Sequence, residues 1–338
     1  MAPAASDADT SSKIPLNMIQ TEPSYIQPLK EIRDDRVSGA SELSREAALV
    51  FILFSTQHKA GSNDEFFQKL LTLGVALITA QPHMAPIFNL VNSILYSAEE
   101  SLLTLSLEEL SEFTKEKAEE FNCNSLSSIQ LIAQHGEKLI EDGSRVLTFS
   151  SSGSILAILK KAKEGGQAFE VIACESRPML EGQLLARFLG NANIPVTLIT
   201  DAAMGAYVPK VDLLLVGADS ISETSFVNKI GTFCLGLLSK EYQVPLYVAC
   251  ERSKFISTDW LPDSFAQGDT KEILEEELLG VKVENPYFEK IPLLLCQQVI
   301  TNEGYFSPYD IPHYIRKTRL CHKLMEYLKA IHPKAPPA

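Results

Sequence analysis

The stretch RVLTFSSSGSILAILKKAKEGG, residues 145–166, contains the change of pattern that decides the fold. A short apolar run ends in serines and a glycine, and a helical pattern of apolar residues starts directly after them. A strand, a tight polar turn and a helix in this order are typical of proteins built on a parallel sheet. The free N–H groups at such a helix start bind anions, but serines there also serve as ordinary helix caps. The turn is therefore either a ligand-binding corner or only a cap.

The same alternation continues after residue 143. Helical stretches separate the apolar runs FEVIACES, PVTLITD, VDLLLVGAD and PLYVACE, and LLLCQQVIT is a weaker run. Strands that are apolar on both faces and alternate with helices indicate a parallel sheet covered by helices. We therefore expect an α/β protein in which residues 143–330 form a Rossmann-like, mostly parallel sheet of about six strands with helices on both faces.

The first part of the chain has a different periodicity. In residues 21–142 the apolar residues recur at helical spacing, as in SELSREAALVFILFSTQ and NDEFFQKLLTLGVALITAQ. This pattern predicts a helical N-terminal domain. Residues 1–20 are rich in Ala, Ser, Asp and Pro, and residues 331–338 are rich in Pro and Ala, so both segments are expected to be disordered tails.

The amino-acid composition excludes several classes of binding partner. The chain has a net charge of −13, which repels nucleic-acid backbones and anionic membranes, so neither is an expected partner. Its six cysteines form no C-x-x-C pair and its six histidines no H-x-x-x-H pair, so we expect neither a metal site nor a cofactor. The chain shows no secretory signal pattern and no apolar run near the ~18 residues of a membrane helix, which predicts a cytoplasmic protein.

Ligands of parallel sheets bind where the strands end, and polar residues follow several of the predicted strands. They are Ser150–Ser152, Glu175–Arg177, Asp201, Asp219 and Glu251. Arg177 offers a planar fork for a phosphate, and Glu175 could accept sugar hydroxyls. Equally, the two side chains could form a structural ion pair at a helix start.

The segment LLLVGADSISETSFVNKIGTF adds an acid, an amide and a cation. Asp219 directly follows an apolar strand, which suits general acid/base work. Asn228 and Lys229 are expected at a helix start, where they could hold hydroxyls and clamp a phosphate. Lys254 in VACERSKFIS could add a second cation. The ordinary alternatives are a capping aspartate and solvent-exposed lysines. Taken together, these residues predict a site for a sugar phosphate.

These motifs resemble a known superfamily over most of the chain. ESRP-x-LEG, VGADSI, NKIGT and CERSKF are similar to motifs of ribose-1,5-bisphosphate isomerases, methylthioribose-1-phosphate isomerases and the alpha, beta and delta subunits of translation initiation factor 2B. The isomerases use a cysteine after the first α/β strand and the aspartate of the G-A-D motif to transfer protons. The resemblance makes Asp219 that aspartate, and it implies a dimer built through the α/β domains.

The sequence departs from the isomerase pattern at three places. The cysteine position falls on Ser150, whose hydroxyl does not titrate near neutrality. Where the isomerases have Arg-Gly-Ala, this chain has Ser38-Gly39-Ala40. Where they have Arg-Pro in the helical domain, this chain has Gln81-Pro82. The resemblance and the residue patterns together give a site with Asp219 and Ser150 at the catalytic positions. The substrate-binding positions are Gly39, Ala40, Ser151, Ser152, Gly153, Glu175, Arg177, Asn228, Lys229 and Lys254.

Two functions remain in competition. The first is an initiation factor 2B-like protein, a homodimer or higher oligomer, that binds a sugar phosphate or nucleoside monophosphate with weak or no catalysis. It could have a protein partner of translation-factor type. The second is an aldose–ketose isomerase acting on a ribose 1-phosphate-type substrate, with Asp219 as acid/base. An acyl transferase using Glu251 is a distant third.

Overall fold

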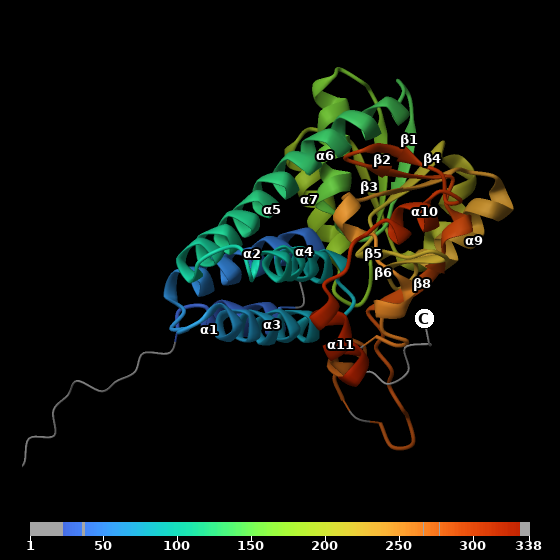
Figure 1. The fold of residues 1–338 in the computed structure, drawn as a ribbon. Helices are drawn as coiled ribbons and strands as arrows, with labels where there is room; N and C mark the ends of the chain where they lie inside the picture. Colours follow the sequence, from blue (N-terminus) through green and yellow to red (C-terminus); the bar gives the residue numbers. More distant parts are fainter. Residues whose placement is uncertain (1–22, 36–37, 266, 277, 332–338) are drawn as a thin grey trace, which may run out of the picture.

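The computed structural model describes residues 23–35, 38–265, 267–276 and 278–331. The tail predicted for residues 1–20 lies outside these ranges, as does the C-terminal tail except for residue 331. A helical part and an α/β part lie against each other, and one long helix runs along both (Figure 1). Among the described residues, no helix has the length and apolar character needed to span a bilayer.

Within the described residues, five helices form the N-terminal part. They are α1 (Ile26–Asp34), α2 (Ala40–Gln57), α3 (Asn63–Ala80), α4 (Ala85–Ser101) and α5 (Leu107–Gly136). Ser106 and Glu109 form a capping box that starts α5, because each side chain accepts the other residue's backbone N–H. Gly74 lets α3 approach α4 closely, since a Cβ there would lie 2.6 Å from Cγ1 of Val91.

The α/β part is built on a seven-stranded sheet in the order β10-β9-β7-β4-β1-β2-β3. The strands are β1 (Arg145–Thr148), β2 (Glu170–Cys174), β3 (Val196–Ile199), β4 (Leu213–Val216), β7 (Leu246–Ala249), β9 (Gln298–Thr301) and β10 (Gly304–Phe306). All neighbours pair in parallel except β9 and β10, which form an antiparallel hairpin.

Helices cover both faces of this sheet. The helices of this part are α6 (Gly153–Glu164), α7 (Glu181–Asn191), α8 (Met204–Tyr207), α9 (Thr232–Tyr242), α10 (Ile311–Arg316) and α11 (His322–Ile331). Val146 packs on one face with residues of α5, α6 and α7, whereas Leu147 packs on the other with residues of α8, α9 and α10. The predicted fold class, a mostly parallel sheet flanked by helices after a helical region, is therefore confirmed.

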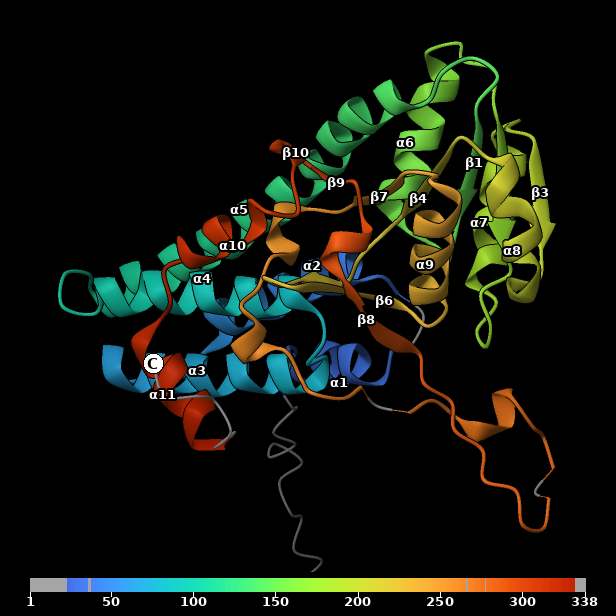
Figure 2. The same ribbon diagram turned by 90° about the vertical axis from the view of Figure 1, so that its right-hand side faces the viewer.

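A second, antiparallel sheet was not predicted. It has the order β5-β6-β8 and consists of β5 (Ser220–Ile221), β6 (Ser225–Lys229) and β8 (Phe288–Pro292). Figures 1 and 2 show it between the main sheet and the helical part. Val227 of β6 and Leu324 of α11 belong to the same apolar core as the N-terminal helices. The C-terminal helix thus packs into the helical part.

Candidate ligand site at the strand ends

The serine turn after β1 is held against the turn after β2. Ser150 has a left-handed backbone, with φ of 66°, and its N–H donates to Oγ of Ser176 at 2.7 Å. The Asp201 carboxylate accepts the N–H groups of Ser176 at 2.8 Å and of Arg177 at 2.7 Å. The sequence marks Asp201 only as a polar strand-end residue. In the structure it holds the turn whose Ser176 hydroxyl accepts the Ser150 N–H.

The N-terminus of α6 has no side-chain cap. Ser152 occupies the N-cap position without making a capping hydrogen bond, and α6 begins at the exposed Gly153. Ser152 instead packs on the end of β4, because a Cβ on Gly217 would lie 2.8 Å from its Oγ. Ser151 is half-buried in the same turn. The serine turn was interpreted either as a ligand-binding corner or as a helix cap. The structure does not show a capping hydrogen bond from Ser152.

Asp219, Asn228 and Lys254 lie around the β5–β6 hairpin. The N–H of Asp219 donates to the carbonyl oxygen of Val227 at 2.9 Å, which places Asp219 next to Asn228. The amide of Asn228 donates to Thr232 at 3.0 Å. Lys254 is buried, and its ammonium donates to the carbonyl oxygen of Ala218 at 2.7 Å. An acid, an amide and a buried cation therefore meet at the end of β4.

Lys229 lies where the α/β part meets the helical part. Its buried ammonium pairs with Oε1 of Glu181 and lies 5.0 Å from the ring centroid of Tyr287 and 5.4 Å from that of Phe288. The Phe288 ring is 4.4 Å from that of His83, in the turn before α4. Sequence reasoning did not select Glu181, although it lies within the ESRP-x-LEG motif.

The predicted helix start at Asn228 and Lys229 is wrong, since both residues belong to β6 and α9 begins at Thr232. The N-terminus of α9 is occupied by Glu289, whose Oε1 accepts the N–H groups of Gly231 at 2.7 Å and Phe233 at 2.8 Å. Burial raises the pKa of Glu289, and these backbone hydrogen bonds partly oppose the rise. A phosphate held by Lys229 would not also reach this helix end unless Glu289 moved.

Arg177 and Glu175 are separated from this group. Arg177 is exposed, and its Nη2 donates to the carbonyl oxygen of Glu272 at 2.8 Å, in a distant loop. Glu175 is half-buried at the end of β2. Within the described ranges no ion pair joins the two side chains. The Lys229 ammonium pairs with Glu181 and the Lys254 ammonium contacts Ala218, whereas the Arg177 guanidinium is directed to Glu272.

The helical residues of the predicted site lie at the start of α2. Gly39 is the exposed N-cap residue and Ala40 is the buried first residue of the helix. Gln81, at the position where the isomerase resemblance expects an arginine, is buried. Its amide donates to the carbonyl oxygens of Ile32 at 2.7 Å and Asp35 at 3.1 Å. Gln81 therefore connects α1 to the turn before α4.

The cysteines at the strand ends do not replace the missing thiol. Cys174 and Cys250 lie at or just beyond the ends of β2 and β7, and both are fully buried. Burial raises the pKa of each thiol to about 12. Neither is a thiolate at neutral pH, so neither can perform the proton transfer that the isomerases assign to their cysteine.

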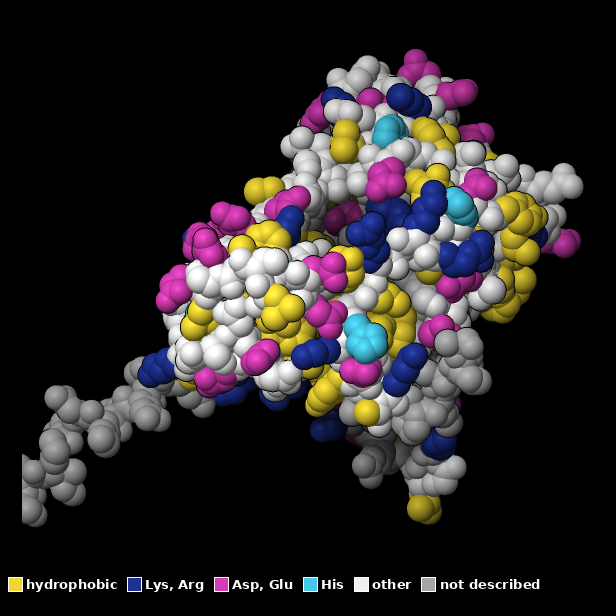
Figure 3. Space-filling view, viewed as in Figure 1, with side chains coloured by type: hydrophobic (Ala, Val, Ile, Leu, Met, Phe, Trp, Pro, Cys, Tyr) yellow, Lys and Arg dark blue, Asp and Glu magenta, His cyan; other side chains and the backbone are white. Residues whose placement is uncertain are grey.

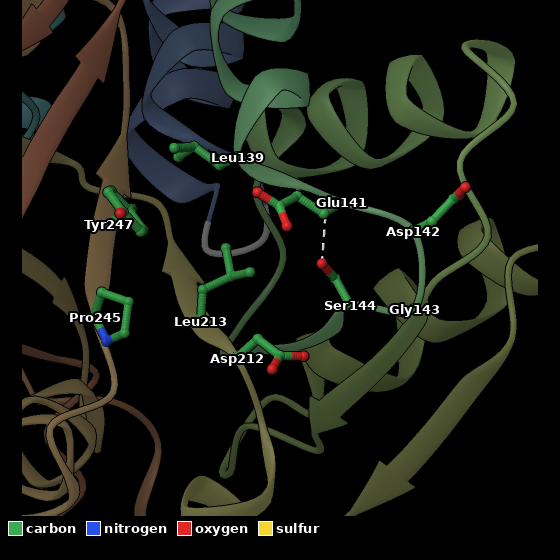
Figure 4. Close-up of a pocket in the computed structure, with 9 residues that line it drawn as sticks. All are labelled: Leu139, Glu141, Asp142, Gly143, Ser144, Asp212, Leu213, Pro245 and Tyr247. Atoms are coloured by element: carbon green, nitrogen blue, oxygen red, sulfur yellow. Dashed lines mark hydrogen bonds between the residues drawn. The ribbon is translucent and has the colours of Figure 1, made fainter.

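A pocket also lies at the opposite edge of the sheet, before the strands begin (Figure 4). Its volume is about 370 Å³, and it is lined by residues that precede or start β1, β4 and β7, among them Ser144, Asp212 and Pro245. Oγ of Ser144 accepts the N–H of Glu141 at 3.0 Å. This pocket is separate from the turns that carry the predicted site residues.

The chain belongs to the Initiation factor 2 subunit family, which it matches over residues 36–308. It is 34% identical over 289 residues to the ribose 1,5-bisphosphate isomerase of Archaeoglobus fulgidus, covering 84% of this chain and 90% of the relative. It is 31% identical to a putative translation initiation factor eIF-2B subunit 2-like protein of Pyrococcus furiosus, covering 84% and 96%.

Solved structures agree with the family. A translation initiation factor eIF-2B from Pyrococcus horikoshii superposes with a TM-score of 0.73 at 29% identity, covering 85% of this chain and 98% of the other. The 5-methylthioribose 1-phosphate isomerase of the same organism gives a TM-score of 0.67 at 22% identity, covering 90% and 88%. The second comparison shows a shared fold only. Relatives with an isomerase name and relatives with a translation-factor name thus both resemble this chain.

Proposed function

We propose that this protein binds a sugar phosphate at the strand ends and converts it weakly or not at all. The observation that carries the proposal is the serine at position 150, where the resemblance to the isomerases places a cysteine. A hydroxyl transfers protons poorly without an adjacent base. The neighbouring thiols, with pKa values of about 12, cannot substitute for it.

Binding of an anion is supported by the charges and donors that surround the serine turn. Lys254 is buried and forms no ion pair within the described part of the chain. A buried ammonium without a carboxylate partner is costly, and an anionic ligand would offset that cost. The uncapped start of α6 adds backbone donors, and Asn228 and Asp219 are placed to contact hydroxyl groups.

The same contacts favour one phosphate group over two. Lys229 is already paired with Glu181. The Arg177 guanidinium contacts Glu272. At position 81 the chain has an uncharged glutamine, whose amide donates to a carbonyl oxygen of the helical part. Neither position therefore directs a cation at the ligand. A bisphosphate would therefore find fewer cationic contacts here than the isomerase pattern provides.

Catalysis as an aldose–ketose isomerase is the second candidate. It is favoured by the 34% identity to a ribose 1,5-bisphosphate isomerase and by the retained aspartate, Asp219. In that function Asp219 would transfer the proton while an aldose 1-phosphate becomes a ketose, and Ser150 or a water molecule would replace the thiol.

One set of variants separates the two candidates. Ketose formation from ribose 1-phosphate and ribose 1,5-bisphosphate is measured for the wild type, Ser150→Cys and Asp219→Asn. We expect little or no turnover by the wild type and a gain with Ser150→Cys that Asp219→Asn abolishes in the double variant. Wild-type turnover as fast as that of Ser150→Cys would overturn the proposal in favour of the isomerase.

Binding is measured separately, by the shift in melting temperature with each sugar phosphate and with nucleoside monophosphates. A ligand at a hundred times its Kd stabilises the folded protein by about 2.7 kcal/mol. If none of these compounds shifts the melting temperature of the wild type, the binding function is wrong, whatever the turnover assay shows.

We also propose that the protein works as a homo-oligomer, with a protein partner of translation-factor type as a further candidate. A solved eIF2B-beta2-delta2 complex from C. thermophilum, which shares this fold at 21% identity and a TM-score of 0.70, is tetrameric. Light scattering would test the assembly, and a monomeric mass at micromolar concentration would contradict it.

A further inference from the structure

A second cavity lies between the helical part and the α/β part. It has a volume of about 340 Å³ and is bounded by α4, the 3-10 turn Arg252–Lys254 and residues 318–319. In Figure 3, Lys and Arg side chains gather beside a hollow between α4 and α10, and an acidic side chain is visible within the hollow. The cavity is within the size range of small-molecule sites, which start at roughly 300 Å³.

Two arginines from separate segments line this cavity. Arg252 is half-buried, with its guanidinium 4.4 Å from the ring centroid of Phe255, and its Nη2 donates to the carbonyl oxygen of Tyr314 at 2.9 Å. Nη1 of Arg319 lies 3.5 Å from the hydroxyl of Tyr96. Within the described ranges neither guanidinium pairs with a carboxylate. Most of their donor groups are therefore available to a ligand.

Ser253 also lines the cavity. Its Oγ is itself buried and has no hydrogen-bond partner among the described residues.

One segment beside the cavity is basic. Residues 311–325 contain four Lys and Arg residues and no Asp or Glu, between Asp310 and Glu326. The Glu99 carboxylate lies nearby and accepts the N–H groups of His322 and Lys323. Burial lowers the pKa of Arg252, and the Glu303 carboxylate opposes that fall. The two arginines are the groups of the cavity that would attract an anion.

We propose that this cavity, the arginine cleft, is a second anion site that binds the phosphate of a small phosphomonoester. Arg252 and Arg319 hold the phosphate oxygens. Guanidinium groups suit this role because their planar fork matches phosphate geometry. The arginine cleft is distinct from the strand-end site, which uses Lys229, Lys254 and the turn after β1.

The test uses glycerol 1-phosphate as probe, titrated calorimetrically into the full-length protein at constant ionic strength. Arg319→Gln is the main variant, since its guanidinium makes a single long contact and its loss should not disturb folding. Arg252→Gln is the second variant. Lys317→Gln is the matched control, because this exposed lysine belongs to the same basic segment but does not line the cleft.

We expect each arginine variant to weaken binding roughly ten- to hundred-fold, as loss of a charge-assisted hydrogen bond does. Lys317→Gln should leave binding at wild-type affinity. Three outcomes would overturn the proposal. The first is no binding to the wild type at millimolar concentration. The second is unchanged binding to Arg319→Gln. The third is an equal loss with Lys317→Gln, which would indicate diffuse charge instead of a site.

Discussion

Lys229 and Glu181 form a buried ion pair that joins β6 to the first turn of α7. The side chain of Lys229 is 4% exposed and that of Glu181 is 13% exposed, so water screens the pair poorly. Oε2 of Glu181 has no hydrogen-bond partner within the described chain. The ion pair therefore gives the Lys229 ammonium a partner, but only one of the two carboxylate oxygens of Glu181 has one. A ligand anion would compete with Glu181 for the same ammonium.

Replacing Glu181 with Gln should weaken folding and strengthen anion binding. Removing one partner of a buried pair destabilises a protein by about 3–5 kcal/mol, because the remaining charge is left unpaired. The free energy of unfolding in urea checks the first effect, and calorimetry with a sugar phosphate checks the second. In Glu181→Gln/Lys229→Met, where neither charge remains, part of the stability should return and the gain in affinity should vanish. Weaker sugar-phosphate binding by Glu181→Gln would show that Lys229 does not meet the ligand.

Replacing Ser176 with Ala should loosen the turn that carries Ser150. The variant removes the acceptor of the Ser150 N–H, and a buried donor left without a partner costs about 1–3 kcal/mol. We expect lower stability in urea and faster amide exchange at Ser150. Ser239→Ala is the comparison, because it also removes a buried serine, one that donates to Val244 beyond α9. It should reduce stability without altering sugar-phosphate affinity, whereas Ser176→Ala should reduce both.

Replacing Gly182 with Ala should disrupt the contact between α7 and β2. A Cβ at Gly182 would lie 1.7 Å from the carbonyl oxygen of Cys174, a backbone atom that cannot move aside. Overpacking of this kind costs at least about 1–3 kcal/mol. Gly190→Ala in the same helix is the control, because a Cβ there meets no atom within 4 Å. The control should be neutral or stabilising, and equal melting temperatures for the two variants would contradict the close approach.

Acidification should destabilise the helical part through His58. Burial, followed by the charge of Lys69, lowers the pKa of His58 below its ordinary value of 6.5, and Nδ1 accepts the N–H of Ala60 at 3.3 Å. The unfolded chain therefore takes up a proton before the folded protein does. The neutral His58 side chain therefore contributes fully to the free energy of unfolding above pH 6.5. This contribution is lost as the pH falls towards the lowered pKa of the folded protein.

The measurement for this prediction is urea unfolding of the wild type and His58→Gln from about pH 7.5 to 5.5. The wild type should lose more stability than the variant over this range, so that the two curves converge as the pH falls. Parallel curves would mean that His58 does not carry the effect.

Most strands of the main sheet were predictable because each is a short apolar run bounded by turns. The short strand β10, which pairs with β9 in a hairpin, was not predicted. The β5–β6–β8 sheet was not predicted either, since Ser220–Ile221 is too short to show periodicity and β8 lies far along the chain from β6. Because strand β6 was not predicted, Lys229 was expected at a helix start. Its place at the end of β6 depends on pairing with Phe288, a contact that no local pattern reveals.

The residues of the site were predictable as strand-end residues, but the directions of their side chains were not. Arg177 follows β2 as expected, yet its guanidinium contacts the backbone of Glu272, 95 residues away. Glu181 was missed because an acid in the first turn of a helix is an ordinary, favourable feature. Only its ion pair with the buried Lys229 connects this acid to the proposed site.

The side-chain amide of Asn89 in α4 donates to the carbonyl oxygens of both Ser253, at 2.6 Å, and Phe255, at 2.8 Å. The residue between these carbonyls is Lys254, whose ammonium reaches Ala218 beside Asp219. The side-chain amide of Asn89 therefore holds the backbone on both sides of the buried Lys254 by hydrogen bonds. Any rotation of the helices relative to the sheet must either break two short hydrogen bonds or carry that positive charge along. The orientation of the helical part is therefore linked, through Asn89, to the position of the backbone that carries Lys254.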